Sequence, residues 1–449
     1  MDYPEIEFKW EWLAADDAKA PELRATWARL EMYVGTSCLT LVEDVESSSS
    51  RRSVFVPLYP LAEWIAFNWW SLIADARPAA LMSKPGRRGN SLFEPATKKH
   101  RERHGLRNAG DGFLWPNLLV LPQGQTTYLS WRADVDINPN HPIKYLTSGD
   151  STADAQHVQR ALRHLVEAVI TRLHERDVIG TTLETEWLSV QGADEAEAAY
   201  CVAAARLGLD PYSDAAEYEP QILSAARALE EGVLGDFLDA VEPSQIVETL
   251  AWVTSTVDQI KELPTTTSRL LPLKLEIDRL ARTGDSPPHS LPWEAGWRQA
   301  RIVRQAMAVD DRSPVQVEDL VTSVVRAAPT RSLQAVGTPT GGATDPPIAV
   351  GQTLRSSTRR FTLARALWHL LWDAPGTFLV TSAYTDRQKV ERAFAAELLA
   401  PASGIATMIN DDSLTNLDED LVERIASSYK VSAMLIEHQI ENQVLPAFQ

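Results

Sequence analysis

The segment from Arg359 to Pro401 constrains what this chain can fold into more than any other part of its sequence. Apolar residues recur at helical spacing in two stretches, 361–372 and 386–399, and an Ala-Pro-Gly sequence stands between them. Proline and glycine in succession interrupt a helix, so the spacing predicts two amphipathic helices joined by a short irregular segment. If the chain carries out catalysis, we expect the residues responsible to lie on these two helices.

Individual residues of the two helices match a known zinc-peptidase pattern. The first helix fits the lead-in of the form F-T-x-A-H-E-x-x-H at Phe361, Thr362 and Ala364. The second fits the form E-x-x-A-[ND]-x-F-A-A-x-L-L-x-P at Phe394, Ala395, Ala396, Leu398, Leu399 and Pro401. On these residues the region 290–449 resembles the ImmA/IrrE family of metallopeptidases, known for phage-repressor cleavage and stress response. The resemblance implies a zincin-like domain whose two helices carry the metal ligands.

The residues that would perform the chemistry depart from that pattern. Where the family has its first histidine, its glutamate, its second histidine and its third ligand, this chain has Arg365, Ala366, His369 and Gln388. Arg392 stands at a supporting Asp/Asn position. Arginine offers no lone pair to a metal, alanine cannot accept a proton, and a catalytic zinc site needs three protein ligands. The sequence therefore predicts a catalytically degenerate peptidase-like domain without a cofactor.

Two competing expectations concern the carboxylates of the second helix. A buried arginine needs a counter-charge, so we expect Arg365 to pair with Glu391 or Glu397 in the space where the family binds its metal. The alternative is an active zinc endopeptidase with relocated ligands, in which His369 joins Glu391 or Glu397 and a repressor-like partner is cleaved. Both expectations use the same two carboxylates.

Composition restricts the class of protein. With 44% apolar and 23% charged residues, the chain of 449 residues is typical of globular proteins with more than one domain. No stretch reaches the ~20 apolar residues of a membrane span, and the first residues lack the layout of a signal peptide. The two cysteines, Cys38 and Cys201, are expected to be reduced thiols in packed segments. We expect a cytoplasmic protein with no membrane partner.

The first region, 1–145, is predicted to be a mixed α and β domain. Strands are expected in four segments rich in β-branched and aromatic residues: 25–42, 53–57, 117–122 and 126–131. A helix over 57–75 is apolar almost all round, which indicates burial. Three tryptophans of this helix are expected in the core rather than in a ligand site: Trp64, Trp69 and Trp70.

A basic segment, Lys84–Arg107, stands in a chain whose net charge is -18. The overall charge argues against the whole protein being a nucleic-acid binder, because phosphate binding requires lysine and arginine. The segment contains glycine and proline and has no apolar period, which predicts a loop or mobile arm. It is either a solvated loop that balances acidic neighbours or a contact for nucleic acid or a phosphate ligand. The candidate polyanion-binding residues are Lys84, Arg87, Arg88, Lys98, Lys99, Arg101, Arg103 and Arg107.

The region 150–280 is predicted to be helical, because apolar residues recur at spacings of three and four. The expected helices are 154–175, 194–207, 219–232 and 243–263. Thr, Pro and Ser are frequent at the ends of 265–292, which we interpret as a domain boundary.

The last region, 290–449, combines the peptidase-like pattern with a helical tail. A short strand is expected at 348–350, and the resemblance implies that it is an edge strand with which an extended peptide pairs. Residues 417–442 predict two helices around a turn, with Ser432 as the N-cap of the second. Because that second helix is acidic, we interpret the pair as a structural hairpin rather than a reader of DNA.

These features together predict an α+β, predominantly helical fold. Its parts are an N-terminal mixed α/β domain, a central helical region and a C-terminal zincin-like domain with a helix-turn-helix-like tail. The expected function is that of a regulatory, sensing or protein-binding module, and the family association implies phage defence or stress response. A protein partner is expected, with nucleic acid bound only through the basic segment.

Overall fold

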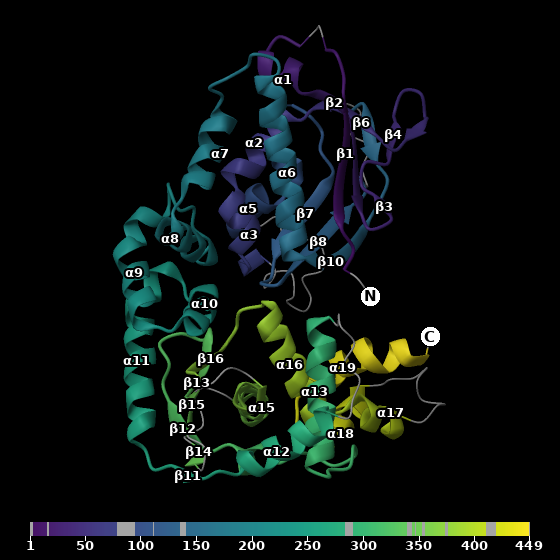
Figure 1. The fold of residues 1–449 in the computed structure, drawn as a ribbon. Helices are drawn as coiled ribbons and strands as arrows, with labels where there is room; N and C mark the ends of the chain where they lie inside the picture. Colours follow the sequence, from purple (N-terminus) through teal and green to yellow (C-terminus); the bar gives the residue numbers. More distant parts are fainter. Residues whose placement is uncertain are drawn as a thin grey trace. The chain divides into compact units, whose positions relative to one another are not determined.

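The computed structural model describes residues 3–15, 18–78, 95–110, 112–134, 141–282, 291–338, 344–345, 347–352, 355–372, 376–409 and 419–448. Two compact units divide the chain, unit 1 (Met1–Glu219) and unit 2 (Pro220–Gln449) (Figure 1). This division differs from the three expected regions 1–145, 150–280 and 290–449, because the central helices are shared between the two units. The expected mixed α and β character with more helix than strand is confirmed. Among the described residues, no helix has the length and apolar character needed to cross a membrane.

Unit 1 contains two larger antiparallel sheets and one small sheet. The first has the order β1-β2-β3, with β6 also paired to β2; its strands are β1 (Ile6–Trp12), β2 (Trp27–Val34), β3 (Ser37–Cys38) and β6 (Val54–Pro57). The second has the order β10-β8-β7, with β7 (Asn117–Pro122), β8 (Thr126–Arg132) and β10 (Gly149–Asp154). The small sheet joins β5 (Ser50–Arg51), β4 (Val42–Asp44) and β9 (Ile143–Tyr145). All four segments expected to hold strands do so, and Gly124, with a φ of 110°, makes the turn between β7 and β8.

Helices pack against these sheets and enclose the core of unit 1. They are α1 (Pro21–Ala25), α2 (Tyr59–Phe67), α3 (Trp69–Ala74), α5 (Pro95–His104), η2 (Leu106–Asn108), α6 (Ala155–His174), α7 (Thr182–Gly192), α8 (Glu195–Arg206) and η3 (Ala215–Tyr218). The helix expected over 57–75 is broken into α2 and α3 at Asn68, and its three tryptophans are buried as predicted. Helix α7 was not expected. The two cysteines are free, as predicted.

Helix α5 corrects the expectation of a loop in the basic segment, since the described part of that segment is helical from Pro95. A sequence without an apolar period can still form a helix when polar side chains anchor it to the rest of the fold. Here Trp64 donates from Nε1 to the carbonyl of Glu102 at 2.9 Å, and His104 is buried. Tertiary contacts therefore override the local pattern.

Unit 2 is organised around a four-stranded sheet in the order β12-β15-β13-β16. Its strands are β12 (Ser323–Arg326), β13 (Leu333–Gly337), β15 (Ile348–Gly351) and β16 (Phe378–Thr381). Strand β15 pairs with β12 in parallel and with β13 in antiparallel orientation, so the expectation of an edge strand at 348–350 is wrong. Two short strands, β11 (Thr266–Thr267) and β14 (Thr344–Asp345), form a separate ladder.

Helices cover both faces of this sheet. Those of unit 2 are α9 (Glu219–Ala228), α10 (Glu231–Ala240), η4 (Pro243–Gln245), α11 (Ile246–Glu262), α12 (Leu270–Ala281), α13 (Pro292–Ala306), α14 (Val317–Leu320), α15 (Ser356–Trp372), α16 (Asp386–Leu399) and α17 (Ala402–Met408). Helices α11 and α15 both contact β13 and β15 and lie on opposite faces of the sheet (Figure 1). Gly296 lets α13 approach α16 closely, because a Cβ atom there would collide with the carbonyl of Val390.

Several expected helices of unit 2 are confirmed with changed limits. Helix α16 spans the predicted residues 386–399, α15 begins earlier than predicted, and the segment expected to be irregular between them contains β16. The helix expected at 219–232 is two helices, α9 and α10. Helix α12 lies within the stretch 265–292 that we interpreted as a domain boundary, and it packs on α13.

The tail forms the expected helical hairpin and shares a small core with α17. It consists of α18 (Glu419–Tyr429), α19 (Ala433–Gln439), η6 (Ile440–Val444) and η7 (Leu445–Phe448). Lys430 makes the turn with a φ of 58°. Ser432 precedes α19 as predicted, but its side chain makes no capping hydrogen bond, so that detail is wrong.

Candidate functional site

The residues at the positions of the zinc-peptidase pattern meet in unit 2, where α15 packs against α16 and the sheet. Arg365 is 1% exposed and donates from Nε to Oε1 of Glu391 at 3.0 Å. Its Nη2 contacts the same carboxylate oxygen and donates to the carbonyl of Thr381 at 2.6 Å. Its Nη1 donates to Oε1 of Gln334 at 2.8 Å. The predicted pairing of Arg365 with a carboxylate of the second helix is confirmed for Glu391.

His369, one turn further along α15, is held from both sides. Its Nε2 lies 2.5 Å from Oε2 of Glu391, and its Nδ1 lies 3.4 Å from Nη2 of Arg387. Because a guanidinium can only donate, Nδ1 accepts, and the ring proton on Nε2 is donated to Glu391. Phe378 stacks on the imidazole, with the ring centroids 4.7 Å apart. Both nitrogens are therefore engaged within the protein, and neither offers a lone pair to a metal.

Gln388, at the position where the resemblance implies a third ligand, takes part in a hydrogen-bond network that joins α16 to α10. Gln388 donates from Nε2 to Oδ1 of Asp236 at 2.7 Å and accepts at Oε1 from the backbone N–H of Thr385 at 3.2 Å. Arg387 donates from Nη1 to Oδ2 of Asp236 at 2.6 Å and to the carbonyl of Gly232 at 3.1 Å. Gln388 thus caps its own helix and fixes a neighbouring one.

Burial and charge act in opposite directions on the ionisable groups of this network. Burial alone would raise the pKa of Glu391, but the Arg365 guanidinium and the hydrogen bond from His369 hold that pKa below its ordinary value. Burial raises the pKa of Asp236 despite the neighbouring Arg387. Burial and the charge of Arg365 lower the pKa of Arg392 to about 10. Arg365, Arg387 and Arg392 together disfavour a bound cation.

The residues do not fit the zinc ion that the resemblance implies. Ala366, at the glutamate position, is buried in the apolar core and carries no polar side-chain atom. Glu397 binds elsewhere, since Oε1 accepts from Arg301 at 2.8 Å and Oε2 accepts from Gln439 at 2.9 Å. In the part of the chain that the structure describes, no cluster of three metal-ligating side chains includes His369. The residues named for a relocated zinc site are thus engaged in contacts within the protein.

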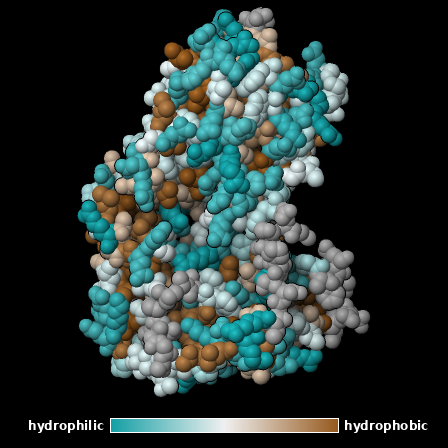
Figure 2. All heavy atoms as spheres, in the orientation of Figure 1, coloured by the Kyte–Doolittle hydropathy of each residue, from teal (hydrophilic) through white to brown (hydrophobic). Residues whose placement is uncertain are grey.

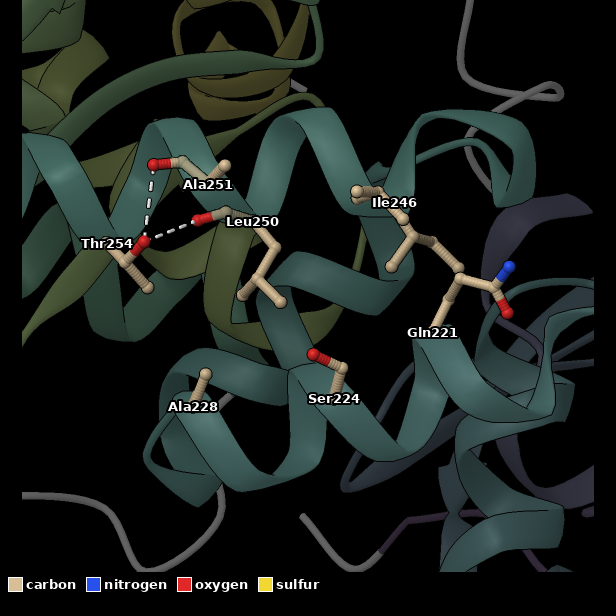
Figure 3. A pocket seen from close by; sticks show the side chains of 8 residues that line it. Gln221, Ser224, Ala228, Ile246, Leu250, Ala251 and Thr254 are labelled. Atoms are coloured by element: carbon tan, nitrogen blue, oxygen red, sulfur yellow. Dashed lines mark hydrogen bonds between the residues drawn. The ribbon is translucent and has the colours of Figure 1, made fainter.

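A groove of about 290 Å³ lies between α9 and α11 (Figure 3). It is lined by Gln221, Ser224, Ala228, Ile246, Val247, Leu250, Ala251 and Thr254. The hydroxyl of Thr254 donates to the carbonyls of Leu250 and Ala251 at 3.1 and 3.2 Å, within its own helix. Apolar residues reach the surface over these helices (Figure 2), and Leu223 and Val247 are exposed. The lining contains no ionisable residue, which suits apolar contact and not acid–base catalysis.

Intramolecular ion pairs engage much of the described basic segment. Lys99 and Arg103 both contact Oδ2 of Asp214 at 2.6 Å. Arg107 contacts Asp134 at 2.6 Å, and exposed Lys98 lies 3.7 Å from Glu102. Arg101 is partly buried on the same helix. Three candidates lie outside the described residues: Lys84, Arg87 and Arg88. These pairs favour the interpretation that the segment balances acidic neighbours.

Reasoning from the sequence missed a second buried cluster in this same segment. His100 and His104 lie four residues apart on α5, and both face Asp75 at the end of α3. The spacing H-x-x-x-H is visible in the sequence and indicates two imidazoles on one helix face. The signal was missed because a loop, not a helix, was expected at these residues.

Comparison of the chain with models of known protein families, with curated proteins and with solved structures finds no match. The two clusters are therefore interpreted from their own chemistry.

Proposed function

We propose that unit 2 is a peptidase-like scaffold of the ImmA/IrrE type that lacks metal-dependent hydrolysis and binds a protein partner, in a regulatory or phage-defence setting. The observation that carries this proposal is the closed network around Arg365. The buried guanidinium of Arg365 donates to the carboxylate of Glu391, and both ring nitrogens of His369 make hydrogen bonds within the protein. A zinc peptidase needs those same groups as ligands with free lone pairs.

The network supports a binding role because it holds the surrounding helices and strands together, as a bound metal ion would. Arg365 connects α15 to α16, to β13 through Gln334 and to β16 through Thr381. Arg387 extends the connections to α10 through Asp236. Removing one partner of such a buried ion pair strongly destabilises a protein. A scaffold of this kind keeps its surface in one conformation without an ion.

The surface that best suits a partner is the free edge of the sheet at β12. The N–H of Ile348 donates to the carbonyl of Thr322 at 2.8 Å. Because alternate residues of a parallel strand point their backbone groups to the same side, Val324 also faces β15 and Val325 faces away. Within the described residues no strand pairs with that side, and Val325 is 50% exposed. An extended segment of a partner protein can add a strand there.

Metal content tests the catalytic half of the proposal. The full chain, purified without a histidine tag, is compared with His369→Gln and with the triple variant Arg365→His/Ala366→Glu/Gln388→Glu. We expect His369→Gln to leave the zinc content unchanged and the triple variant to gain about one equivalent, because it restores three ligands and a base. Only differences between variants count, so metal bound elsewhere does not matter. Loss of an equivalent in His369→Gln would contradict the proposal, even if the triple variant does not fold.

Partner capture tests the binding half. The native chain and the variants Val325→Pro and Val325→Thr are expressed separately, each in full length with the same purification label. The proteins that co-purify with each chain are quantified. Proline removes the outward N–H, whereas threonine keeps the strand, so threonine is the matched control. We expect a protein held by the native chain and by Val325→Thr to fall about tenfold with Val325→Pro, the equivalent of one lost hydrogen bond. Equal capture by all three chains, or no captured protein, would contradict binding at this edge.

A further inference from the structure

Three side chains with metal-ligating atoms converge in unit 1. Asp75 directly follows α3, and His100 and His104 stand on α5; their ligand atoms all lie within 4.8 Å of one another. Oδ2 of Asp75 lies 3.5 Å from Nδ1 of His100 and 3.2 Å from Nε2 of His104. Two ligands of a tetrahedral zinc ion, each about 2.0–2.1 Å from the metal, are about 3.3–3.5 Å apart. These two separations therefore match those around a single ion.

The proton on His104 makes the cluster incomplete without a cation. Its Nδ1 lies 2.9 Å from the carbonyl oxygen of Val120, which can only accept, so Nδ1 carries the proton. In the neutral ring Nε2 then presents a lone pair to Oδ2 of Asp75. Two acceptors facing each other in a buried place repel unless a positive ion lies between them. That ion is either a second proton on the ring or a metal.

The distances favour a metal over a second proton. A hydrogen bond between an imidazolium and a carboxylate is normally about 2.7–2.9 Å long. The separations of Asp75 from His104 and His100 exceed that range. Nδ1 of His100 is also buried without a hydrogen bond in the described structure. One coordinated ion engages all three atoms at once.

Outer contacts hold two of the three side chains in the orientation that a metal needs. The carbonyl of Val120 fixes the ring of His104 and its tautomer. The backbone N–H of Arg77 donates to Oδ1 of Asp75 at 3.1 Å, which leaves Oδ2 directed at the histidines. Outer partners of this kind are characteristic of histidine and carboxylate ligands in metal sites.

We propose that Asp75, His100 and His104 form a binding site for one divalent transition-metal ion, most suitably zinc. Imidazole nitrogens suit zinc and its neighbours in the first transition row, while one carboxylate among two imidazoles does not suit calcium or magnesium. The site ties α5 to the end of α3 and, through Val120, to β7. Three protein ligands leave one position open. His100 is the least buried ligand, with 18% of its side chain exposed, so a water molecule reaches the ion from its side. This proposal is independent of the function proposed for unit 2.

Cobalt and zinc titrations of the full chain test the site. The protein is purified without a histidine tag, stripped with a chelator and titrated with Co²⁺, whose visible absorption reports its ligands; Zn²⁺ is then added as competitor. We expect one equivalent of Co²⁺ to bind and to be displaced by Zn²⁺. Asp75→Asn and His100→Gln should each weaken binding by at least the 10- to 100-fold that loss of an outer partner causes.

Two matched variants serve as controls. His174→Gln alters another histidine–carboxylate pair of unit 1, in which Nε2 of the exposed His174 side chain lies 2.7 Å from Glu184. His369→Gln alters the buried pair of unit 2. Both should bind metal like the native chain. Absence of saturable binding, or equal affinity in Asp75→Asn, His100→Gln and the native chain, would overturn the proposal. Unchanged hydrogen exchange in α6 shows that the variants are folded.

Discussion

Unit 1 and unit 2 each bury a histidine against a carboxylate, but they balance the pair in different ways. In unit 2 Arg387 gives His369 a donor on Nδ1, which leaves Nε2 protonated toward Glu391. In unit 1 the carbonyl of Val120 accepts a hydrogen bond from Nδ1–H of His104, which leaves the lone pair of Nε2 directed toward Asp75. The partner on the far side of the ring therefore decides whether a buried histidine–carboxylate pair is self-sufficient or needs an ion.

The positive charge that Arg365 supplies in unit 2 is permanent, whereas the positive charge proposed for the site in unit 1 depends on a bound ion. A guanidinium keeps its charge at any ordinary pH and is covalently part of the chain. A metal ion is lost to a chelator and its binding depends on ligand protonation. The cluster in unit 2 is therefore fixed, and the cluster in unit 1 is expected to respond to metal supply.

Removing Arg365 should have the largest effect, because the buried carboxylate of Glu391 then loses its guanidinium partner and keeps only the hydrogen bond from His369. Arg365→Ala is expected to lower the free energy of unfolding of unit 2 by about 3–5 kcal/mol. Hydrogen exchange of the amides of α16 in the full chain measures this loss, with α6 of unit 1 as an internal reference. Arg279→Ala, which removes an exposed pair with Glu276, is the control and should change nothing measurable. A loss below about 1 kcal/mol for Arg365→Ala would show that the network is dispensable.

Zinc should stabilise unit 1 and leave unit 2 unchanged, which sharpens the comparison between the clusters. At a free zinc concentration 100 times its dissociation constant, the gain is about 2.7 kcal/mol. It is measured as slower hydrogen exchange in α5 and β7 of the chelator-treated chain after zinc is added. His100→Gln should remove the gain. Equal slowing in α15 and α16 would mean that zinc does not distinguish the two clusters.

The pH dependence of stability should reveal the fixed charge of unit 2. The pKa of Glu391 in the folded protein lies below its ordinary value of 4.5, so the group stabilises the fold fully above about pH 4.5. This contribution is lost as the pH falls through the lowered pKa, by up to about 1.4 kcal/mol per pH unit. The difference in unfolding free energy between the native chain and Glu391→Gln should therefore shrink below pH 4.5.

Asp236 provides the opposite sign in the same network. Burial raises its pKa in the folded protein above the ordinary 3.8, so its contribution is present at lower pH and is lost as the pH rises through the raised pKa. The difference between the native chain and Asp236→Asn should move in the direction opposite to that for Glu391→Gln. Unfolding of the full chain in urea measures both differences in free energy, with hydrogen exchange of the amides of α16 as the readout. Parallel curves would show that the two carboxyls titrate as ordinary groups.

Local rules explain why the pairing of Arg365 with Glu391 could be predicted from the sequence. Helices α15 and α16 carry their own apolar period, and a buried guanidinium requires a carboxylate within reach. The other half of the network could not be predicted, because Arg387 and Asp236 are 151 residues apart and neither has a local signal. Strand β16 was missed for a related reason. All four of its residues are buried, so it shows no alternation that would distinguish a strand.

The cluster in unit 1 was missed because charged residues surround its histidines in the sequence. His100 and His104 have the spacing of ligands on one helix face, but they stand among lysines and arginines that indicate solvent exposure. The ion pairs of Lys99 and Arg103 with Asp214 anchor the helix and allow the neighbouring face, which carries the histidines, to be buried. Asp75 directly follows another helix, α3, and only the fold brings it to the histidines.

The smallest effect is a difference in tautomer, and it tests the comparison without any substitution. Nitrogen NMR of the metal-free chain, at a pH where both rings are neutral, should show the proton of His369 on Nε2 and that of His104 on Nδ1, because their partners are an arginine and a carbonyl. Addition of zinc should shift the Nε2 signal of His104 and leave His369 unchanged. If both rings carried the same tautomer, the two histidine–carboxylate pairs would differ only in their neighbouring residues. The comparison would then give no reason for one pair to need an ion and the other not.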